Sequence, residues 1–105
     1  MRTAPLGTTG EQVSALALGC MQMGTLADDE TSFALLDRYA EAGGTFLDTA
    51  DCYAWWWARG TDGGQSEDVI GRWMVARGSR DATFVATKGS GRTDHAGAWP
   101  ADRAA

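Results

Sequence analysis

The chain has 105 residues, enough for one small domain or for part of a larger one. Hydrophobic residues make up 44% and charged residues 22%, which favours a folded chain over a disordered one. The net charge of −5 argues against nucleic-acid binding, because phosphate recognition needs a basic patch. The sequence contains no apolar run near the ~18 residues of a membrane span, and its first ten residues do not resemble a secretory signal. We therefore expect a cytoplasmic protein without membrane contact.

Turn and capping residues divide the sequence into short alternating elements. Glycine-containing turns separate the apolar segments, and acidic residues begin both helical patterns, where they suit the positive end of the helix dipole. The order is hairpin, strand, helix, strand, helix, strand, which predicts crossover connections and a parallel sheet, hence an α/β fold. The predicted elements are a hairpin over residues 1–13, strands over 15–19, 45–48 and 82–88, and helices over 28–42 and 66–77.

Three local features give further expectations. The continuously apolar segment 15–19 predicts a strand that is covered on both faces. Ser66 precedes Glu67 and Asp68 and is interpreted as the cap that begins the second helix. Gly71 in that helix suggests close packing against the sheet.

The predicted sheet is small for a finished domain. Three parallel strands with two helices leave two open edges and partly uncovered apolar faces. Residues 1–89 are therefore interpreted as the first part of a larger domain, and we expect the isolated chain to associate with itself through its exposed edges. Residues 90–105 show no usable period and are interpreted as an irregular or disordered tail.

Side chains able to transfer a proton follow the predicted strands. Asp48 ends the second strand, Tyr53 comes shortly after it, and Lys88, the single lysine of the sequence, ends the third. Because the carboxyl ends of parallel strands meet at one rim, these three side chains should converge. A free tyrosine is a poor acid at neutral pH, but an ammonium ~4 Å away favours the phenolate by roughly 4 kcal/mol at an effective dielectric near 20. Asp48 would orient the ammonium and keep it charged.

Four separated segments resemble the aldo-keto reductase superfamily in the order that family shows. Together they cover residues 2–89, most of the chain. The segments are Leu6–Gly10 with Leu18–Met21, Leu47–Tyr53, Ser66–Gly71 and Val85–Gly89. The resemblance implies a (β/α)₈ TIM barrel. By this resemblance the sequence contains the N-terminal hairpin and the first three β/α units, so the barrel is incomplete after the third strand.

The resemblance also implies a function and a set of site residues. The family is a class of oxidoreductases that reduce aldehydes and ketones with NADP(H), and its catalytic tetrad contains Asp, Tyr, Lys and His. By resemblance Asp48, Tyr53 and Lys88 take the first three places, with Tyr53 as the proton donor. Cys20 and Met21, together with Asp48, stand where the family contacts the cofactor. The implied partner is a small carbonyl substrate.

Departures from the family pattern leave enzymatic activity of this chain uncertain. The tetrad histidine lies on a following strand in the family, and His95, the single histidine here, lacks such a strand context. The family binds most of the dinucleotide with its last strands. We therefore expect this chain alone to be inactive. A non-catalytic remnant or interaction fragment is the alternative, and a small α/β binding domain that shares the motif is a weaker one.

The remaining candidates have competing interpretations. The tryptophans Trp55, Trp56 and Trp57 could line a substrate pocket or pack a long loop onto its own body, with at least one exposed. Cys20 and Cys52 have no metal-motif spacing, and each is more typical of a small buried side chain than of a reactive thiol. We expect no metal site.

Overall fold

The structure is a computed structural model that describes residues 1–55, 57–58 and 60–89. Within these residues the order of elements follows the predicted one. The elements are β1 (Thr3–Pro5), β2 (Gln12–Ser14), β3 (Leu18–Gly19), α1 (Asp29–Glu41), β4 (Phe46–Asp48), α2 (Gln65–Arg77), a 3₁₀ turn η1 (Arg80–Ala82) and β5 (Phe84–Ala86). The predicted tail, residues 90–105, lies outside the described residues.

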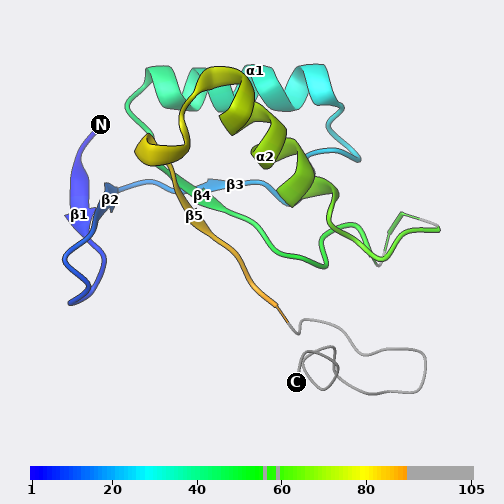
Figure 1. Cartoon of the computed structure of the whole chain (residues 1–105), viewed down its shortest axis with the longest axis horizontal. Helices are drawn as coiled ribbons and strands as arrows, with labels where there is room; N and C mark the ends of the chain where they lie inside the picture. Colours follow the sequence, from blue (N-terminus) through cyan, green and yellow to red (C-terminus); the bar gives the residue numbers. More distant parts are fainter. Residues whose placement is uncertain (56, 59, 90–105) are drawn as a thin grey trace.

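The strands form two separate sheets. β1 and β2 make the predicted antiparallel hairpin, and β3, β4 and β5 make a parallel sheet with β4 in the centre. The register places Leu47 of β4 between Leu18 of β3 and Val85 of β5. Figure 1 shows the hairpin at one end of the molecule and both helices along one side of the parallel sheet. The predicted α/β organisation, with crossover helices between parallel strands, is confirmed.

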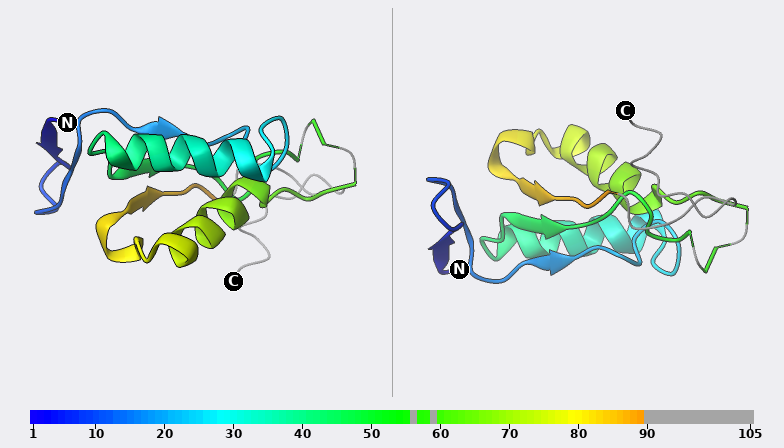
Figure 2. Two further views of the ribbon diagram at one scale, coloured as in Figure 1. Left: turned by 90° about the horizontal axis from the view of Figure 1, so that it is seen from above. Right: turned by 90° about the horizontal axis from the view of Figure 1, so that it is seen from below.

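The hydrophobic core lies between the parallel sheet and the two helices. Figure 2 shows from above and from below that α1 and α2 lie on the same side of the sheet. Burial of a large aliphatic side chain contributes about 1.5–3 kcal/mol, so this layer supplies most of the stabilisation of the described part. The buried residues of the core are Cys20, Met23, Leu36, Leu47, Val69, Ile70 and Trp73.

Glycine and aspartate residues set the limits of the helices. The carboxylate of Asp28 accepts a hydrogen bond from the Thr31 backbone N–H at 2.8 Å and caps α1. Gly64, with a φ of 100°, precedes α2, and Gly78 ends it with a φ of 61°. The expectation that Ser66 caps α2 was wrong, because Ser66 is inside the helix and its hydroxyl bonds to other elements.

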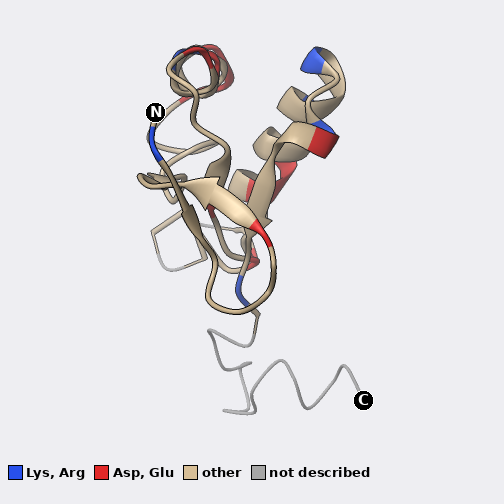
Figure 3. Cartoon of the chain, turned by 90° about the vertical axis from the view of Figure 1, so that its left-hand side faces the viewer, with Lys and Arg blue, Asp and Glu red and all other residues tan. Residues whose placement is uncertain are grey.

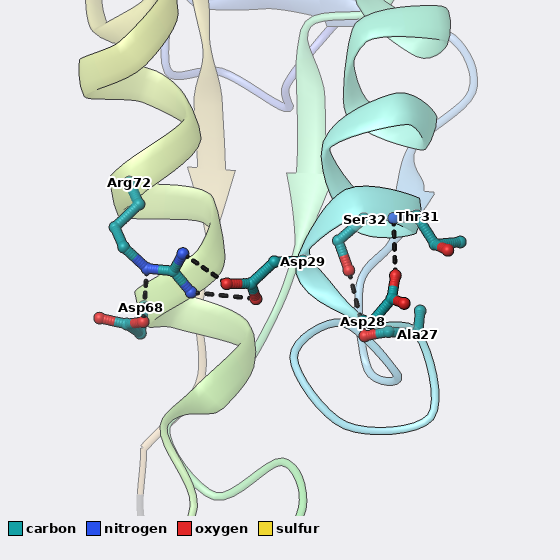
Figure 4. A network of polar contacts seen from close by, with 7 residues as sticks. All are labelled: Ala27, Asp28, Asp29, Thr31, Ser32, Asp68 and Arg72. Carbon is teal, nitrogen blue, oxygen red and sulfur yellow. Dashed lines mark hydrogen bonds and ion pairs between the residues drawn. The ribbon is translucent and has the colours of Figure 1, made fainter.

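Charged side chains join α1 to α2 on the solvent side. Arg72 of α2 donates to Asp29 of α1 at 2.8 and 3.2 Å and to Asp68 of its own helix at 2.8 Å, as Figure 4 shows. Arg77 donates twice to Asp37, at 2.9 Å each. In Figure 3 the charged segments lie mainly along the helices. Such exposed pairs contribute little each and chiefly fix the angle between the helices.

Two local expectations were wrong. β3 is restricted to Leu18–Gly19, and Leu16 in the preceding segment is 68% exposed, because the Ala15 N–H extends the hairpin pairing to the Arg2 carbonyl at 2.8 Å. The segment 15–19 is therefore not covered on both faces. Gly71 does not allow close packing, since a Cβ at this position would meet no atom within 4 Å.

Candidate active site

Asp48 and Lys88 form an ion pair at the carboxyl end of the parallel sheet. Asp48 is the last residue of β4 and pairs with Ala86, so Lys88 lies two residues beyond the end of β5 on the neighbouring strand. The Lys88 Nζ donates to Asp48 Oδ1 at 2.7 Å and to the carbonyl oxygen of Thr49 at 2.8 Å. The predicted approach of these two charges at one rim is therefore observed.

Tyr53 lies beside the same ammonium. The Nζ of Lys88 is 5.0 Å from the centroid of the Tyr53 ring. The next residue, Ala54, is buried and has a φ of 86°, the one left-handed non-glycine conformation among the described residues. A non-glycine residue held there costs of order 1–3 kcal/mol, so the surrounding structure fixes the turn that carries Tyr53. The structure thus brings together all three residues that the sequence singled out.

The electrostatics of the site keep Lys88 protonated. Its pKa is raised, first by the hydrogen bond with Asp48 and then by Tyr53. The Lys88 and Asp48 side chains are 49% and 46% exposed, so solvent screens the pair and its contribution to stability is small, within about 1 kcal/mol. The consequence is chemical: a fixed positive charge lies next to a phenol.

The sequence analysis did not identify a set of buried hydroxyl groups behind the rim. Thr49 and Ser66 are 0% and 1% exposed, and their hydroxyl oxygens lie 2.7 Å apart. The Ser66 hydroxyl also donates to the Cys20 carbonyl oxygen at 2.7 Å. Thr87, next to Lys88, donates through its hydroxyl to Glu67 at the start of α2. The sequence signal that could have identified these residues is their position: Thr49 follows Asp48, Thr87 precedes Lys88, and Ser66 stands at the start of the second predicted helix.

Cys20 and Met21, the residues proposed for cofactor contact, differ in exposure. Cys20 is fully buried in the core, and burial raises the pKa of its thiol to about 12, as expected of an unreactive cysteine. Its side chain belongs to the buried core, its N–H donates to the Asp48 carbonyl oxygen at 2.9 Å, and its carbonyl oxygen accepts from the Ser66 hydroxyl and the Met23 N–H. These bonds argue against direct contact between Cys20 and a cofactor. Met21 is 41% exposed. Cys52 is also buried, at 7% exposure.

The tryptophan loop is only partly described. The Trp57 indole N–H donates to the Thr25 hydroxyl at 3.2 Å, which favours the packing interpretation for this residue. Trp55 is 36% exposed, in line with the expectation that one tryptophan faces solvent. Trp56 and His95 lie outside the described residues.

No helix among the described residues is long and apolar enough to cross a membrane. In the same residues, the acidic, cysteine and histidine side chains form no group of three that could hold a metal ion.

A parallel α/β unit with an acid, a phenol and a lysine at its carboxyl rim is typical of one class of barrel oxidoreductases. The profile of the aldo/keto reductase family matches residues 15–104. An uncharacterized 11.2 kDa protein of Pseudescherichia vulneris is 40% identical over 89 residues, which cover 84% of this chain and 85% of that protein. The chain belongs to the aldo/keto reductase family.

Longer relatives agree in sequence and in fold. An aryl-alcohol dehydrogenase of Phanerodontia chrysosporium, named for NADP⁺, is 44% identical over 88 residues, which are 75% of this chain and 20% of the enzyme. The solved structure of an aldo-keto reductase from Bacillus halodurans, in its holo form, superposes with a TM-score of 0.69 at 30% identity, over 94% of this chain and 30% of that one. The chain thus spans between a fifth and a third of the length of these two relatives.

Proposed function

We propose that Asp48, Tyr53 and Lys88 are the proton-transfer residues of an NADP(H)-dependent enzyme that reduces aldehydes or ketones to alcohols. The observation that supports this most is the ammonium of Lys88, which lies 2.7 Å from the Asp48 carboxylate and 5.0 Å from the centroid of the Tyr53 ring. This setting suits a phenol that acts as general acid for a carbonyl oxygen, because an adjacent cation stabilises the phenolate that forms when the proton leaves.

Each residue has a distinct task in this proposal. The Tyr53 O–H donates its proton to the carbonyl oxygen of the substrate. Lys88 balances the negative charge left on the phenolate oxygen, and Asp48 holds the ammonium in position and in its charged form. NADPH, when bound, supplies the hydride for the carbonyl carbon.

The rim fits the nicotinamide end of such a cofactor better than its phosphate end. Asp48 offers carboxylate oxygens there, and Met21 offers an exposed apolar side chain. Among the described residues of the rim, Lys88 is the one cation, and it is already bonded to Asp48 and Thr49. Residues 1–89 are therefore proposed as a partial barrel unit that holds the proton-transfer groups, while other residues bind the phosphates.

A grafted barrel tests the proposal directly. Residues 1–89 replace the equivalent segment of the Bacillus halodurans relative, and oxidation of NADPH is followed with a panel of aldehydes and ketones. Tyr53→Phe should abolish carbonyl-dependent oxidation while NADPH still quenches the tryptophan fluorescence. Asp81→Asn, on the turn before β5, serves as the matched control and should retain turnover. A Tyr53→Phe graft as active as its parent would exclude the assigned proton donor.

A non-catalytic, interacting unit is the second candidate, and the sheet edges favour it. Within the described residues β3 and β5 each pair with β4 alone, so each presents one unpaired edge. Exposed edges of this kind bind further strands. Sedimentation of the purified chain over a concentration series separates the candidates: concentration-dependent assembly supports this one, and a monomer at all concentrations counts against it.

A further inference from the structure

The Lys88 ammonium depends on a carbonyl group that the sequence motif does not single out. Lys88 Nζ donates to Thr49 O at 2.8 Å as well as to Asp48 Oδ1 at 2.7 Å. An ammonium group has three protons in fixed tetrahedral directions. Two directions occupied by Asp48 and Thr49 determine where the third points, and the Nζ lies over the Tyr53 ring, 5.0 Å from its centroid.

Thr49 is itself held by bonds to two neighbouring elements. Its N–H donates to the Ala86 carbonyl oxygen of β5 at 2.9 Å, which fixes one side of the residue. Its side-chain hydroxyl lies 2.7 Å from that of Ser66 in the first turn of α2. Because the single Ser66 hydroxyl proton goes to the Cys20 carbonyl oxygen, the Thr49 hydroxyl is the donor in the pair.

The two hydroxyls are inaccessible to water. Thr49 is 0% and Ser66 1% exposed, and Cys20, whose carbonyl accepts the last bond, is 0% exposed. Buried hydrogen bonds of this kind are rigid, since no solvent can replace a lost partner. The chain of hydroxyls therefore joins the end of β4, the start of α2 and the residue after β3 behind the rim.

We propose that Thr49 and Ser66 are positioning residues, whose buried hydroxyl pair fixes the Thr49 carbonyl and through it the direction of the Lys88 ammonium towards Tyr53. The proposal deepens the function proposed above and rests on it for its catalytic meaning. It adds two side chains that touch no substrate yet set the geometry of the proton donor.

The single lysine makes the test direct, because the ¹⁵N-labelled Nζ signal belongs to Lys88 without assignment. Thr49→Val removes the hydroxyl at nearly constant volume. We expect the Lys88 ammonium protons to exchange with water about fivefold faster, the factor that corresponds to ~1 kcal/mol for one weakened hydrogen bond. Ser66→Ala should also make the exchange faster, and Thr49→Ser should restore the exchange rate of the parent chain.

Thr83→Val is the matched control. Thr83 is 9% exposed, its hydroxyl donates to the Ser79 carbonyl at 2.8 Å, and it lies at the opposite end of β5. It should lose comparable stability without changing the Lys88 signal. Unchanged exchange in both Thr49→Val and Ser66→Ala would overturn the proposal, as would an equal effect of Thr83→Val.

A kinetic readout separates this inference from the proposed function. In the grafted barrel, Thr49→Val should lower kcat and leave NADPH binding unchanged. An inactive parent graft would count against the proposed function alone, while the exchange of the Lys88 ammonium in the original chain would still decide the positioning role. Altered exchange with unchanged kcat in an active graft would overturn the catalytic part of the inference.

Discussion

The contact between Gly44 and Tyr39 predicts an unusually severe effect for a small substitution. Gly44 lies against the face of the Tyr39 ring, and a Cβ at this position would overlap the ring carbons. Gly44→Ala must therefore displace the ring or the backbone. Overpacking of this kind costs about 1–3 kcal/mol.

The displaced ring would also lose hydrogen bonds. The Tyr39 hydroxyl donates to the Leu16 carbonyl at 2.5 Å, accepts from the Phe46 N–H at 3.2 Å and lies 2.7 Å from the Ser14 hydroxyl. It joins the hairpin, α1 and β4, and each bond contributes about 1 kcal/mol. With part of this network lost, we expect Gly44→Ala to lower the free energy of unfolding by about 3 kcal/mol.

Urea unfolding followed by circular dichroism measures this loss, and a second glycine supplies the control. Gly71 lies in α2, where a Cβ would meet no atom within 4 Å. Gly71→Ala should be neutral or stabilising by up to about 1 kcal/mol, because alanine favours the helix. A Gly44→Ala protein as stable as the parent, or a Gly71→Ala protein equally destabilised, would refute the reasoning.

Two further predictions concern the ionisable side chains of Asp37 and Cys20. The Arg77 guanidinium and the Trp73 indole hold the pKa of Asp37 at about 2, below its usual 3.8, so its stabilisation is present above pH 4 and is lost as the pH falls through 2. Asp37→Asn should therefore weaken the fall in stability between pH 4 and pH 2, measured by urea unfolding at each pH; parallel curves would contradict this. The Cys20 thiol, with its pKa raised to about 12, should resist iodoacetamide in the native chain and react after unfolding, as peptide mass spectrometry can show; rapid native alkylation would argue against its burial.

The order of elements could be predicted because turn residues and apolar periods are local signals. The hairpin, both helices and the strand that ends at Asp48 all follow from such signals. The shortness of β3 could not be predicted, since it depends on the Ala15 N–H bonding to Arg2, a contact set by the hairpin. The cap of α2 was assigned wrongly for a similar reason: Ser66 resembles a cap locally, but its hydroxyl bonds to Cys20 and Thr49, the residues that follow β3 and β4.

The main residues of the candidate site could be predicted from the sequence, but the buried groups that hold them in place could not. Asp48, Tyr53 and Lys88 carry the chemistry, and parallel strands bring the ends of β4 and β5 to one rim whatever the detailed packing. The contribution of Thr49 depends on the direction of its carbonyl group and on a buried partner in α2. Neither feature produces a periodic pattern in the sequence. The burial of Cys20, which argues against its proposed contact with a cofactor, likewise follows from packing between sheet and helices.

The proposed chemistry depends above all on the Asp48–Lys88 pair, and the pKa of the single lysine tests that pair most directly. The pH titration of the Lys88 ε-methylene signals by NMR should give a pKa above the ordinary lysine value of ~10.4, because the hydrogen bond with Asp48 favours the charged form. Asp48→Asn should lower the pKa of Lys88, and Asp37→Asn, on the far side of the helices, should not. A Lys88 that titrates at the ordinary value and is unaffected by Asp48→Asn would contradict the assignment of Asp48, Lys88 and Tyr53 as one proton-transfer unit.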